Sequence, residues 1–328
     1  MISLSVIVCT RDRPQQLRQC LTRIASLVAP TGVTVEILVV NNGSRGDVPD
    51  LVAEVTQGSS LPFHYLEEPA PGLARGRNRG LRAARGEVIA FTDDDCLPAD
   101  DWLAALETAF CRRDVDLLGG RVELHDPSDR PVTIKTKTKR EALRSATGLD
   151  GFVHGCNLAV RRSVVERIGG FDPRFGSGAF VPGAEDTDLI YRAFLAGFRV
   201  RYEPSVVVAH AHGRKTVDAE DRLRRRYRIS IGALQTKYVL RGDRGMREWM
   251  ARDLRRHLGA ARAAWRSPRR MAEPLRLASH HLRGCLCFLL AALLASGDVY
   301  VLPAGRDGEE RTDPATARDL RTGAGTQR

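Results

Sequence analysis

The most informative stretch for the type of fold is Glu87-Val88-Ile89-Ala90-Phe91-Thr92-Asp93-Asp94-Asp95. Its apolar, partly β-branched run predicts a buried strand, and three carboxylates follow directly at the carboxyl end of that strand. Leu4–Thr10 and Val35–Val40 are earlier runs of the same kind, and each of them also leads into polar residues. Buried strands that are separated by helices indicate an α/β fold with a mainly parallel sheet flanked by helices.

The alternation of strands and helices continues to about residue 212. Apolar residues recur at helical spacing after the first strand, and later helices are predicted over Leu73–Ala84, from Asp101 onward, over Val164–Ile168 and over Glu185–Leu195. Later strands are predicted over Phe63–Leu66, Leu117–Leu124, Asn157–Val160 and Val206–Ala209. The polar segment Asp126–Lys139 contains proline and basic residues, which predicts a loop.

The polar residues that follow three of the strands are expected to converge on one cleft. Ligands bind at the carboxyl ends of the strands in sheets of this type, where Thr10–Arg13, Asn41–Ser44 and Asp93–Asp95 would meet. Residues i and i+2 of an extended segment point the same way, so Asp93 and Asp95 can face one ligand. Hard divalent cations prefer carboxylate oxygens, and the acidic run therefore predicts a metal site. The alternative is a solvated acidic turn or a helix cap.

Three further groups can carry chemistry, and each also has a purely structural interpretation. Glu185-Asp186 opens a predicted helix, where a carboxylate can act as a general base or only complement the helix dipole. His210 and His212 lie on one face of a strand end, as metal ligands or as partly buried loop histidines. Arg77, with neighbouring arginines, can neutralise phosphate charge or belong to a solvated helix face.

Length and composition exclude several classes of protein. The chain has 328 residues, of which 43% are hydrophobic and 28% charged, so it is neither a disordered chain nor a fibrous one. Seven cysteines without a CxxC pair argue against a disulfide scaffold and a zinc ribbon, which indicates a reducing compartment. No signal peptide is recognised at the start, and the longest apolar run, Cys285–Ala295, is too short to cross a membrane.

The positive charge is concentrated near the C-terminus. The whole chain carries +11, while Gly213–Cys285 alone holds 20 Lys/Arg and 7 Asp/Glu, or +13. Apolar stripes run through this basic segment, which suits a peripheral helix on an anionic membrane surface, and the alternative is a solvated arginine-rich face. These stripes are Leu223, Tyr227, Leu234 and Tyr238, then Trp249, Leu254, Leu258, Ala261 and Trp265. The Cys285–Ala295 run can dip into the headgroup zone or pack on the rest of the protein.

A nucleic-acid partner is not expected. The arginine-rich helices match no known nucleic-acid-binding module, and an acidic cleft without metal repels phosphates. A nucleotidyltransferase is also disfavoured, because the loop after the first strand contains no glycine.

In order and spacing, the motifs resemble the family 2 glycosyltransferases with the Rossmann-like GT-A fold. The resemblance covers about residues 2–213. The stretches that carry it are Ser5–Pro14, Ile37–Ser44, Gly72–Asn78, Gly86–Pro98, Gly155–Arg162, Gly169–Asp172, Glu185–Leu189 and His210-x-His212. It implies an inverting enzyme that moves a sugar from a nucleoside diphosphate to an acceptor hydroxyl with the help of Mn²⁺ or Mg²⁺.

The resemblance also implies roles for the residues that bind the donor. Thr10, Arg11 and Asn42 would line the base and ribose pocket, and Arg77 and Asp94 would join them around the nucleotide sugar. Asp93-x-Asp95 looks like the family's DxD motif, whose last carboxylate holds the metal against the diphosphate. His212 would contact the metal or the diphosphate.

On the acceptor side, Asp186 looks like the catalytic base of the family's acidic motif, and Glu185 would assist it. Trp102 and the turn at Gly169-Gly170-Phe171-Asp172 would pack around the acceptor and donor. With these carboxylates intact, the alternative of an inactive glycosyltransferase kept as an assembly partner is disfavoured.

The turn after the second strand departs from the family pattern. Many members carry aspartate there, whereas this chain has Asn41 and Asn42. An amide oxygen can still accept from the N3–H of uracil or thymine, so a UDP-sugar is favoured and dTDP- or GDP-sugars remain open. The expected acceptor is a glycan or a lipid-linked sugar of the cell envelope.

The expected organisation has three parts. Residues 1–213 form the GT-A domain, residues 214–304 a basic amphipathic helical extension, and residues 305–328 a polar, disordered tail. The expected location is the cytoplasm, with the protein peripheral at the inner face of the plasma membrane.

Overall fold

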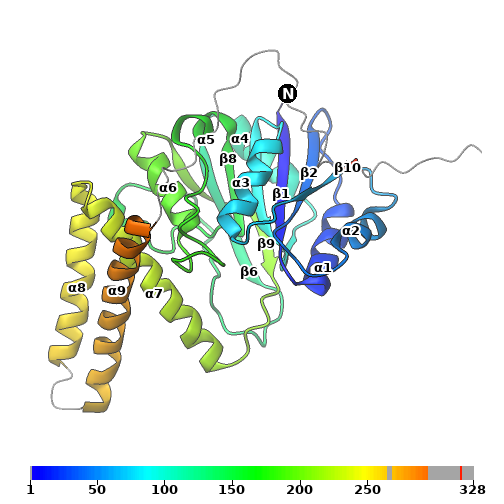
Figure 1. Ribbon diagram of the computed structural model, residues 1–328. Helices are drawn as coiled ribbons and strands as arrows, with labels where there is room; N and C mark the ends of the chain where they lie inside the picture. Colours follow the sequence, from blue (N-terminus) through cyan, green and yellow to red (C-terminus); the bar gives the residue numbers. More distant parts are fainter. Residues whose placement is uncertain (1, 264–267, 295–317, 320–328) are drawn as a thin grey trace, which may run out of the picture.

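A computed structural model of the chain describes residues 2–263, 268–294 and 318–319. Its centre is one sheet, and four strands from the N-terminal part pair in parallel in the order β3-β2-β1-β4 (Figure 1). These strands are β1 (Ser3–Thr10), β2 (Thr34–Asn41), β3 (Phe63–Glu67) and β4 (Val88–Asp93). The α/β prediction and the parallel arrangement of these strands are thereby confirmed.

The other half of the sheet is mixed. β8 (Asn157–Arg161) runs antiparallel to both β4 and β6 (Leu117–Leu124), and β9 (Val200–His210) runs parallel to β6. The chain reaches β8 from β6 through residues 125–156, which contain no α-helix, so no right-handed crossover forces a parallel pairing. Short antiparallel strands complete the sheet: β5 (Cys96–Pro98) and β7 (Glu141–Ala142) on β9, and β10 (Arg318–Asp319) on β3.

β9 is longer than the apolar pattern predicts. It begins at Val200 rather than Val206, and its pairing with β6 shifts register between Gly120 and Arg121. The skipped stretch of β9 contains Pro204, which has no N–H to donate to a neighbouring strand. Because proline and charged residues interrupt the apolar pattern in the first half of β9, the sequence does not predict that half as a strand.

Helices cover both faces of the sheet. Side chains of β1 alternate between two core clusters: Val6 and Val8 face one, and Ile7 and Cys9 face the other. The first cluster is covered by α1 (Pro14–Ala25), α2 (Val48–Thr56) and α4 (Trp102–Cys111). The second is covered by α3 (Leu73–Ala83), α5 (Arg162–Ile168) and α6 (Glu185–Leu195), and a 3₁₀ turn at Ala146–Gly148 adjoins it.

Three long helices follow β9: α7 (Val217–Val239), α8 (Arg244–Ala263) and α9 (Pro268–Leu294). They stand beside α6 at one end of the sheet (Figure 1). Leu234 and Tyr238 of α7 and Trp249 of α8 belong to the same core cluster as Leu189 and Tyr191 of α6. The basic helical extension is therefore confirmed, and it shares a core with the sheet domain.

The described part of the C-terminal segment ends within the predicted apolar run. Cys285 and Phe288 of that run lie in α9, where the Cys285 thiol is 3.7 Å from the Gly232 carbonyl oxygen of α7. Phe288 is buried beside Phe175 of the sheet domain. Trp265, and residues 305–328 except 318–319, lie outside the described residues. Among the helices that are described, none combines the length and apolar character needed to cross a bilayer.

Candidate active site

The acidic turn after β4 sits against the loop that follows β1. Thr10 Oγ1 donates to Asp94 Oδ2 at 2.8 Å, and Arg13 reaches Asp94 at 2.7 Å and Asp95 at 2.9 Å. Both carboxylates are buried, and burial raises the pKa of Asp94 to about 6 although Arg13 opposes this shift. The carboxyl ends of β1 and β4 therefore meet, as the topology predicts.

Asp95 also lies beside a histidine from the end of β9. Its Oδ1 atom is 3.3 Å from His210 Nε2, and Cys96 completes a group whose ligand atoms all lie within 4.8 Å of one another. Burial disfavours the charged form of Asp95, yet the hydrogen bonds from His210 and Arg13 hold its pKa well below the usual range. The same hydrogen bond outweighs burial at His210 and raises its pKa to about 9.

The expectation that Asp93 and Asp95 share one direction is wrong for this structure. β4 ends at Asp93, and Asp94 and Asp95 form a turn, so the alternation of an extended strand does not continue through them. Asp93 points to Arg77, whereas Asp94 and Asp95 share Arg13. Asp93 and Asp94 line the cleft, whereas Asp95 is 5% exposed and is not among the residues that line it.

Arg77 links the acidic turn to the start of α6. Its guanidinium is 2.9 Å from Asp93 Oδ1 and 3.0 Å from Glu185 Oε1, and its side chain is 3% exposed. It also packs against the rings of Phe91 and Phe171. Because Arg77 is buried and paired with two carboxylates, it does not belong to a solvated face of the helix, and that alternative is excluded.

Glu185 and Asp186 begin α6, and they differ in environment. Burial and the neighbouring Asp186 raise the pKa of Glu185 to about 7, against the opposing charge of Arg77. Asp186 is half-buried in the wall of a cavity, where its Oδ2 accepts the Gly155 N–H at 2.8 Å and its Oδ1 accepts the Thr187 N–H at 2.6 Å. A Cβ at Gly155 would lie 2.9 Å from that Oδ2, so a side chain there would displace the carboxylate. These contacts hold Asp186 in one orientation.

Two adjoining cavities meet at the acidic turn. The first holds Thr10, Arg11, Arg13 and Asn42 with Asp94, and the second holds Asp186 with Glu185, His154 and His210. The residues that line both are Leu73, Asp93, Ser177, Arg214 and Arg226. Except for Asp95, the predicted donor-side residues and the predicted base thus line one continuous cleft.

The amides of Asn41 and Asn42 are already engaged. Asn42 Nδ2 donates to the Ala70 carbonyl at 2.8 Å, and its Oδ1 accepts the Gly72 N–H at 2.8 Å. Asn41 Nδ2 donates to Tyr65, and its Oδ1 accepts the Ser44 N–H. Asn42 therefore shapes the wall of the first cavity, and one lone pair of its oxygen is used for that purpose.

His212 does not contact Asp93 or Asp95. Its Nδ1 lies 3.2 Å from Asp129 and accepts the Arg214 N–H at 3.0 Å, while its Nε2 is buried without a hydrogen-bond partner. The two imidazole rings of His210 and His212 lie edge to face, with their centroids 4.9 Å apart. The structure therefore brings His210, not His212, to the acidic turn.

Trp102, Gly170 and Phe171 lie in the interior rather than among the residues that line the two cavities. Trp102 is 0% exposed and donates to Asn157 Oδ1 at 3.1 Å. Phe171 is equally buried, and its backbone N–H donates to Asn78 Oδ1 at 2.8 Å. A Cβ on Gly170 would collide with the same Asn78 oxygen. Trp102 therefore contacts β8, and Gly170 and Phe171 pack against α3, in the interior of the domain.

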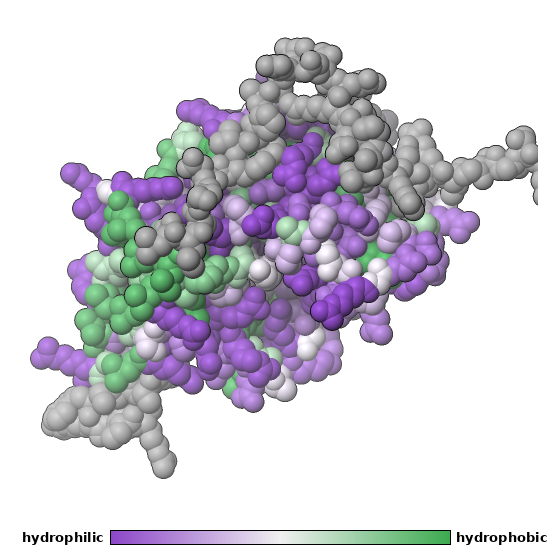
Figure 2. Space-filling model, viewed as in Figure 1, coloured by the Kyte–Doolittle hydropathy of each residue, from purple (hydrophilic) through white to green (hydrophobic). Residues whose placement is uncertain are grey.

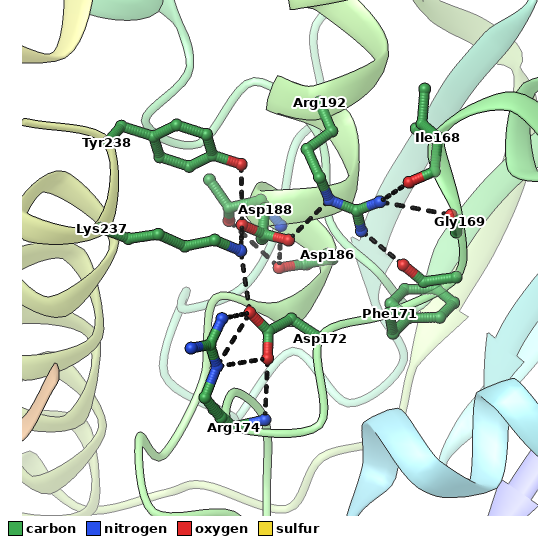
Figure 3. Close-up of polar contacts among 12 residues, drawn as sticks. Ile168, Gly169, Phe171, Asp172, Arg174, Asp186, Asp188, Arg192, Lys237 and Tyr238 are labelled. Carbon is green, nitrogen blue, oxygen red and sulfur yellow. Dashed lines mark hydrogen bonds and ion pairs between the residues drawn. The ribbon is translucent and has the colours of Figure 1, made fainter. Parts of the chain in front are cut away.

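Asp172 joins a buried network between α6 and α7 (Figure 3). Lys237 of α7 donates to Asp172 at 2.9 Å and also to Asp188, and the Tyr238 hydroxyl donates to Asp188 at 2.9 Å. Arg174 pairs with Asp172 at 2.6 Å, and Arg192 with Asp188 at 2.9 Å. Asp172 therefore attaches α7 to the sheet domain, rather than facing the cleft as the resemblance implies.

Several residues of the cleft escape sequence analysis. Arg13 belongs to the stretch Thr10–Arg13 that the sequence places at the cleft, but no individual role is predicted for it. Arg226 and Tyr227 reach the cleft only because α7 docks on the domain, and Arg214 reaches it from the segment between β9 and α7. No local sequence pattern predicts the contact between this C-terminal segment and the domain. Arg214 Nη1 is buried at the junction of the cavities without a hydrogen-bond partner.

Comparison with known families agrees with the motifs and the fold. The sequence model described as "Glycosyl transferase family 2" matches residues 5–169, and "Glycosyl transferase family group 2" matches residues 88–302. The chain belongs to glycosyl transferase family 2. The resemblance to this family that is seen in the motifs is therefore confirmed.

The relatives differ in length and in the molecules they are named for. The pre-mycofactocin glycosyltransferase of Mycobacterium tuberculosis is 30% identical over 222 residues, which are 64% of this chain and 43% of the relative. The chain thus spans less than half the length of that relative. Glycosyltransferase AglE of Haloferax volcanii is 25% identical over 233 residues, which are 71% of this chain and 73% of AglE.

Solved structures confirm the GT-A fold. The mannosyltransferase PcManGT of Pyrobaculum calidifontis, in complex with GDP-Man and Mn²⁺, has a TM-score of 0.61 at 20% identity. The likeness covers 87% of this chain and 86% of PcManGT. TarS of S. aureus has a TM-score of 0.53 at 15% identity, covering 88% of this chain and 54% of TarS.

Proposed function

We propose that this glycosyltransferase moves a sugar from a nucleoside diphosphate donor to an acceptor hydroxyl in one inverting step that uses Mn²⁺ or Mg²⁺. The observation that carries the proposal is the continuous cleft, with the acidic turn on one side and Asp186 on the other. Support comes from PcManGT, whose structure holds GDP-Man and Mn²⁺, and from GalNAc-T7, whose structure holds UDP, GalNAc and Mn²⁺.

The residues around Asp95 fit a divalent cation. Asp95, Cys96 and His210 each offer a ligand atom, and these three atoms all lie within 4.8 Å of one another. Asp95 would hold the ion, with the imidazole of His210 as a further ligand. Oxygen and nitrogen donors of this kind suit Mn²⁺, whereas the buried Cys96 thiol, whose pKa is raised far above its usual value, stays neutral. When bound, the ion neutralises charge on the departing diphosphate.

The side chains of the cleft supply the remaining steps. The acceptor oxygen attacks the anomeric carbon, the bond from that carbon to the diphosphate oxygen breaks, and the electron pair leaves with the diphosphate. Asp186 takes the proton of the acceptor hydroxyl, and the Gly155 and Thr187 N–H groups keep its carboxylate aimed into the cavity. Arg214 and Arg226, at the junction of the cavities, add positive charge where the leaving group develops its negative charge. A single displacement inverts the anomeric configuration.

Hydrolysis of the donor provides a test that needs no known acceptor. UDP-, dTDP- and GDP-sugars would be incubated with Mg²⁺, and the first sugar released would be followed by proton NMR. An α-linked donor is expected to release the β-anomer first, because water then replaces the acceptor in the same displacement. First release of the α-anomer would contradict the inverting step, and an equal rate for Asp186→Asn would remove Asp186 from the role of base.

A further inference from the structure

The outward face of α9 carries a stripe of exposed leucines. Leu282 and Leu286 are 60% and 61% exposed, more than is usual for a leucine in a packed helix. The spacing of seven, four and three residues along the stripe keeps the side chains on one side of the helix. The stripe consists of Leu275, Leu282, Leu286, Leu289 and Leu290.

The other side of α9 is fully used in packing. His281, Gly284 and Phe288 are buried there, and Gly284 lies against the backbone of Ile229 in α7. Leu254 and Leu258 of α8 lie one helical turn apart and are also exposed. Packing of α7, α8 and α9 on one another therefore leaves these leucines in contact with solvent. Figure 2 shows hydrophobic residues gathered over this part of the molecule.

Exposed arginines accompany the leucines on both helices. An arginine directly follows a leucine at Leu254-Arg255, Leu275-Arg276 and Leu282-Arg283, and all three arginines are exposed. A residue one position further along a helix lies about 100° around its axis, so each arginine flanks the stripe. The surface thus combines a hydrophobic centre with a positive margin, within the segment 213–285 that carries +13.

We propose that the leucine stripe of α9, together with the exposed leucines of α8 and the arginines that follow them, docks on an anionic lipid bilayer. A helix surface with these two components lies in the headgroup zone, where leucines enter the acyl boundary and arginines meet lipid phosphates. A second copy of the chain is a poorer occupant, because a two-fold contact would bring the same arginines against one another. The positive charge of the flanking arginines therefore favours an anionic bilayer over a second copy of the chain.

Docking would hold the active site near the membrane surface. α9 packs along α7, and Leu223, Arg226 and Tyr227 of α7 line the cavity that contains Asp186. The helix that touches the bilayer and the helix that walls the acceptor cavity thus form one packed unit. This inference concerns binding alone, so it stands or falls independently of the donor chemistry.

Co-sedimentation with vesicles tests the proposal on the full chain. Vesicles of phosphatidylcholine with 30% phosphatidylglycerol would be compared with pure phosphatidylcholine at 50 and 500 mM salt. The protein is expected to bind the anionic vesicles at low salt and to lose most of that binding at high salt. The double variant Leu282→Asp/Leu286→Asp and the double variant Arg276→Glu/Arg283→Glu should each weaken binding at least tenfold.

Matched variants separate docking from general effects. Leu195→Asp changes a leucine that is 50% exposed on α6. Lys139→Glu reverses an exposed charge that is distant in sequence from α8 and α9. Both should bind vesicles like the wild type, and unchanged thermal unfolding would show that each variant is folded. Absence of binding to anionic vesicles at low salt would overturn the proposal. So would a dimer in light scattering that the leucine double variant dissociates, because the occupant would then be a second copy.

Discussion

Two side chains define the site at the scale of single residues. Asp186 is half-buried and hydrogen-bonded by backbone N–H groups, yet it still lines the cavity. Arg77 is buried between Asp93 and Glu185, where it compensates the charge of the buried Glu185 and of the partly exposed Asp93. The first can therefore exchange a proton with a ligand, and the second keeps the site assembled.

Asp186→Asn is expected to lower the rate of sugar transfer by about 10²–10⁴-fold, because an amide cannot accept the acceptor's proton. Affinity for the nucleoside diphosphate should stay within twofold, since Asp186 lies outside the first cavity. Steady-state kinetics together with calorimetric titration of the nucleotide measures both quantities. Loss of nucleotide binding would instead place Asp186 on the donor side.

Arg77→Met is expected to reduce the free energy of unfolding by about 3–5 kcal/mol, as for other buried pairs that lose one partner. Urea denaturation measures this change, and Arg75→Met on the same helix is the control, because Arg75 is exposed. An effect of Arg77→Met no larger than that of Arg75→Met would show that the two carboxylates do not need this cation.

At the scale of secondary-structure elements, α7 is held in place by charge and by close backbone packing. Lys237 is 0% exposed and reaches both Asp172 and Asp188 (Figure 3). Gly232 of α7 and Gly284 of α9 let the two helices cross at backbone contact. The wall of the acceptor cavity depends on these two devices, because α7 contributes to it.

The stability of the protein is expected to fall as the pH drops below about 4. Burial disfavours ionisation of Asp172 and Asp188, but Arg174, Lys237 and Arg192 outweigh it and hold both pKa values below the ordinary value near 4. The unfolded chain therefore binds more protons in this range, and stabilisation present above pH 4 is lost on acidification. Urea denaturation between pH 6 and pH 2.5 should show this decline. In Lys237→Met the free energy of unfolding should decline less steeply with falling pH. An equally steep decline would contradict the role of Lys237 in lowering the pKa values of Asp172 and Asp188.

Gly284→Ala is expected to destabilise the protein by about 1–3 kcal/mol, because a Cβ would collide with the carbonyl oxygen of Ile229. Gly259→Ala in α8 is the matched control, since nothing lies within 4 Å of a Cβ there. Removing a glycine from that helix should stabilise by up to about 1 kcal/mol. Thermal unfolding of the two variants measures the difference, and equal effects would argue against close packing of α7 on α9.

At the scale of the whole molecule, the sequence predicts the N-terminal half better than the rest. β1, β2 and β4 are continuous apolar runs that end in polar residues, so both the strands and their shared edge could be inferred. The start of β9 and the strand β5 escape, because Pro204 and a turn interrupt the apolar pattern. Motif order does not reveal which way a side chain turns, so it could not show that Asp172 pairs with Lys237 of α7 or that His212 faces Asp129.

A thermal-shift panel tests the central claim, a metal-assisted donor site beside a separate base. UDP, dTDP, GDP and CDP would be tested with and without Mn²⁺ on the wild type, Asp95→Ala and Asp186→Asn. At about 100 times its Kd, a ligand adds roughly 2.7 kcal/mol to the free energy of unfolding. We expect a Mn²⁺-dependent shift with one nucleotide in the wild type and in Asp186→Asn, and none in Asp95→Ala. A shift that ignores Mn²⁺ and persists in Asp95→Ala, or no shift with any nucleotide, would contradict the account.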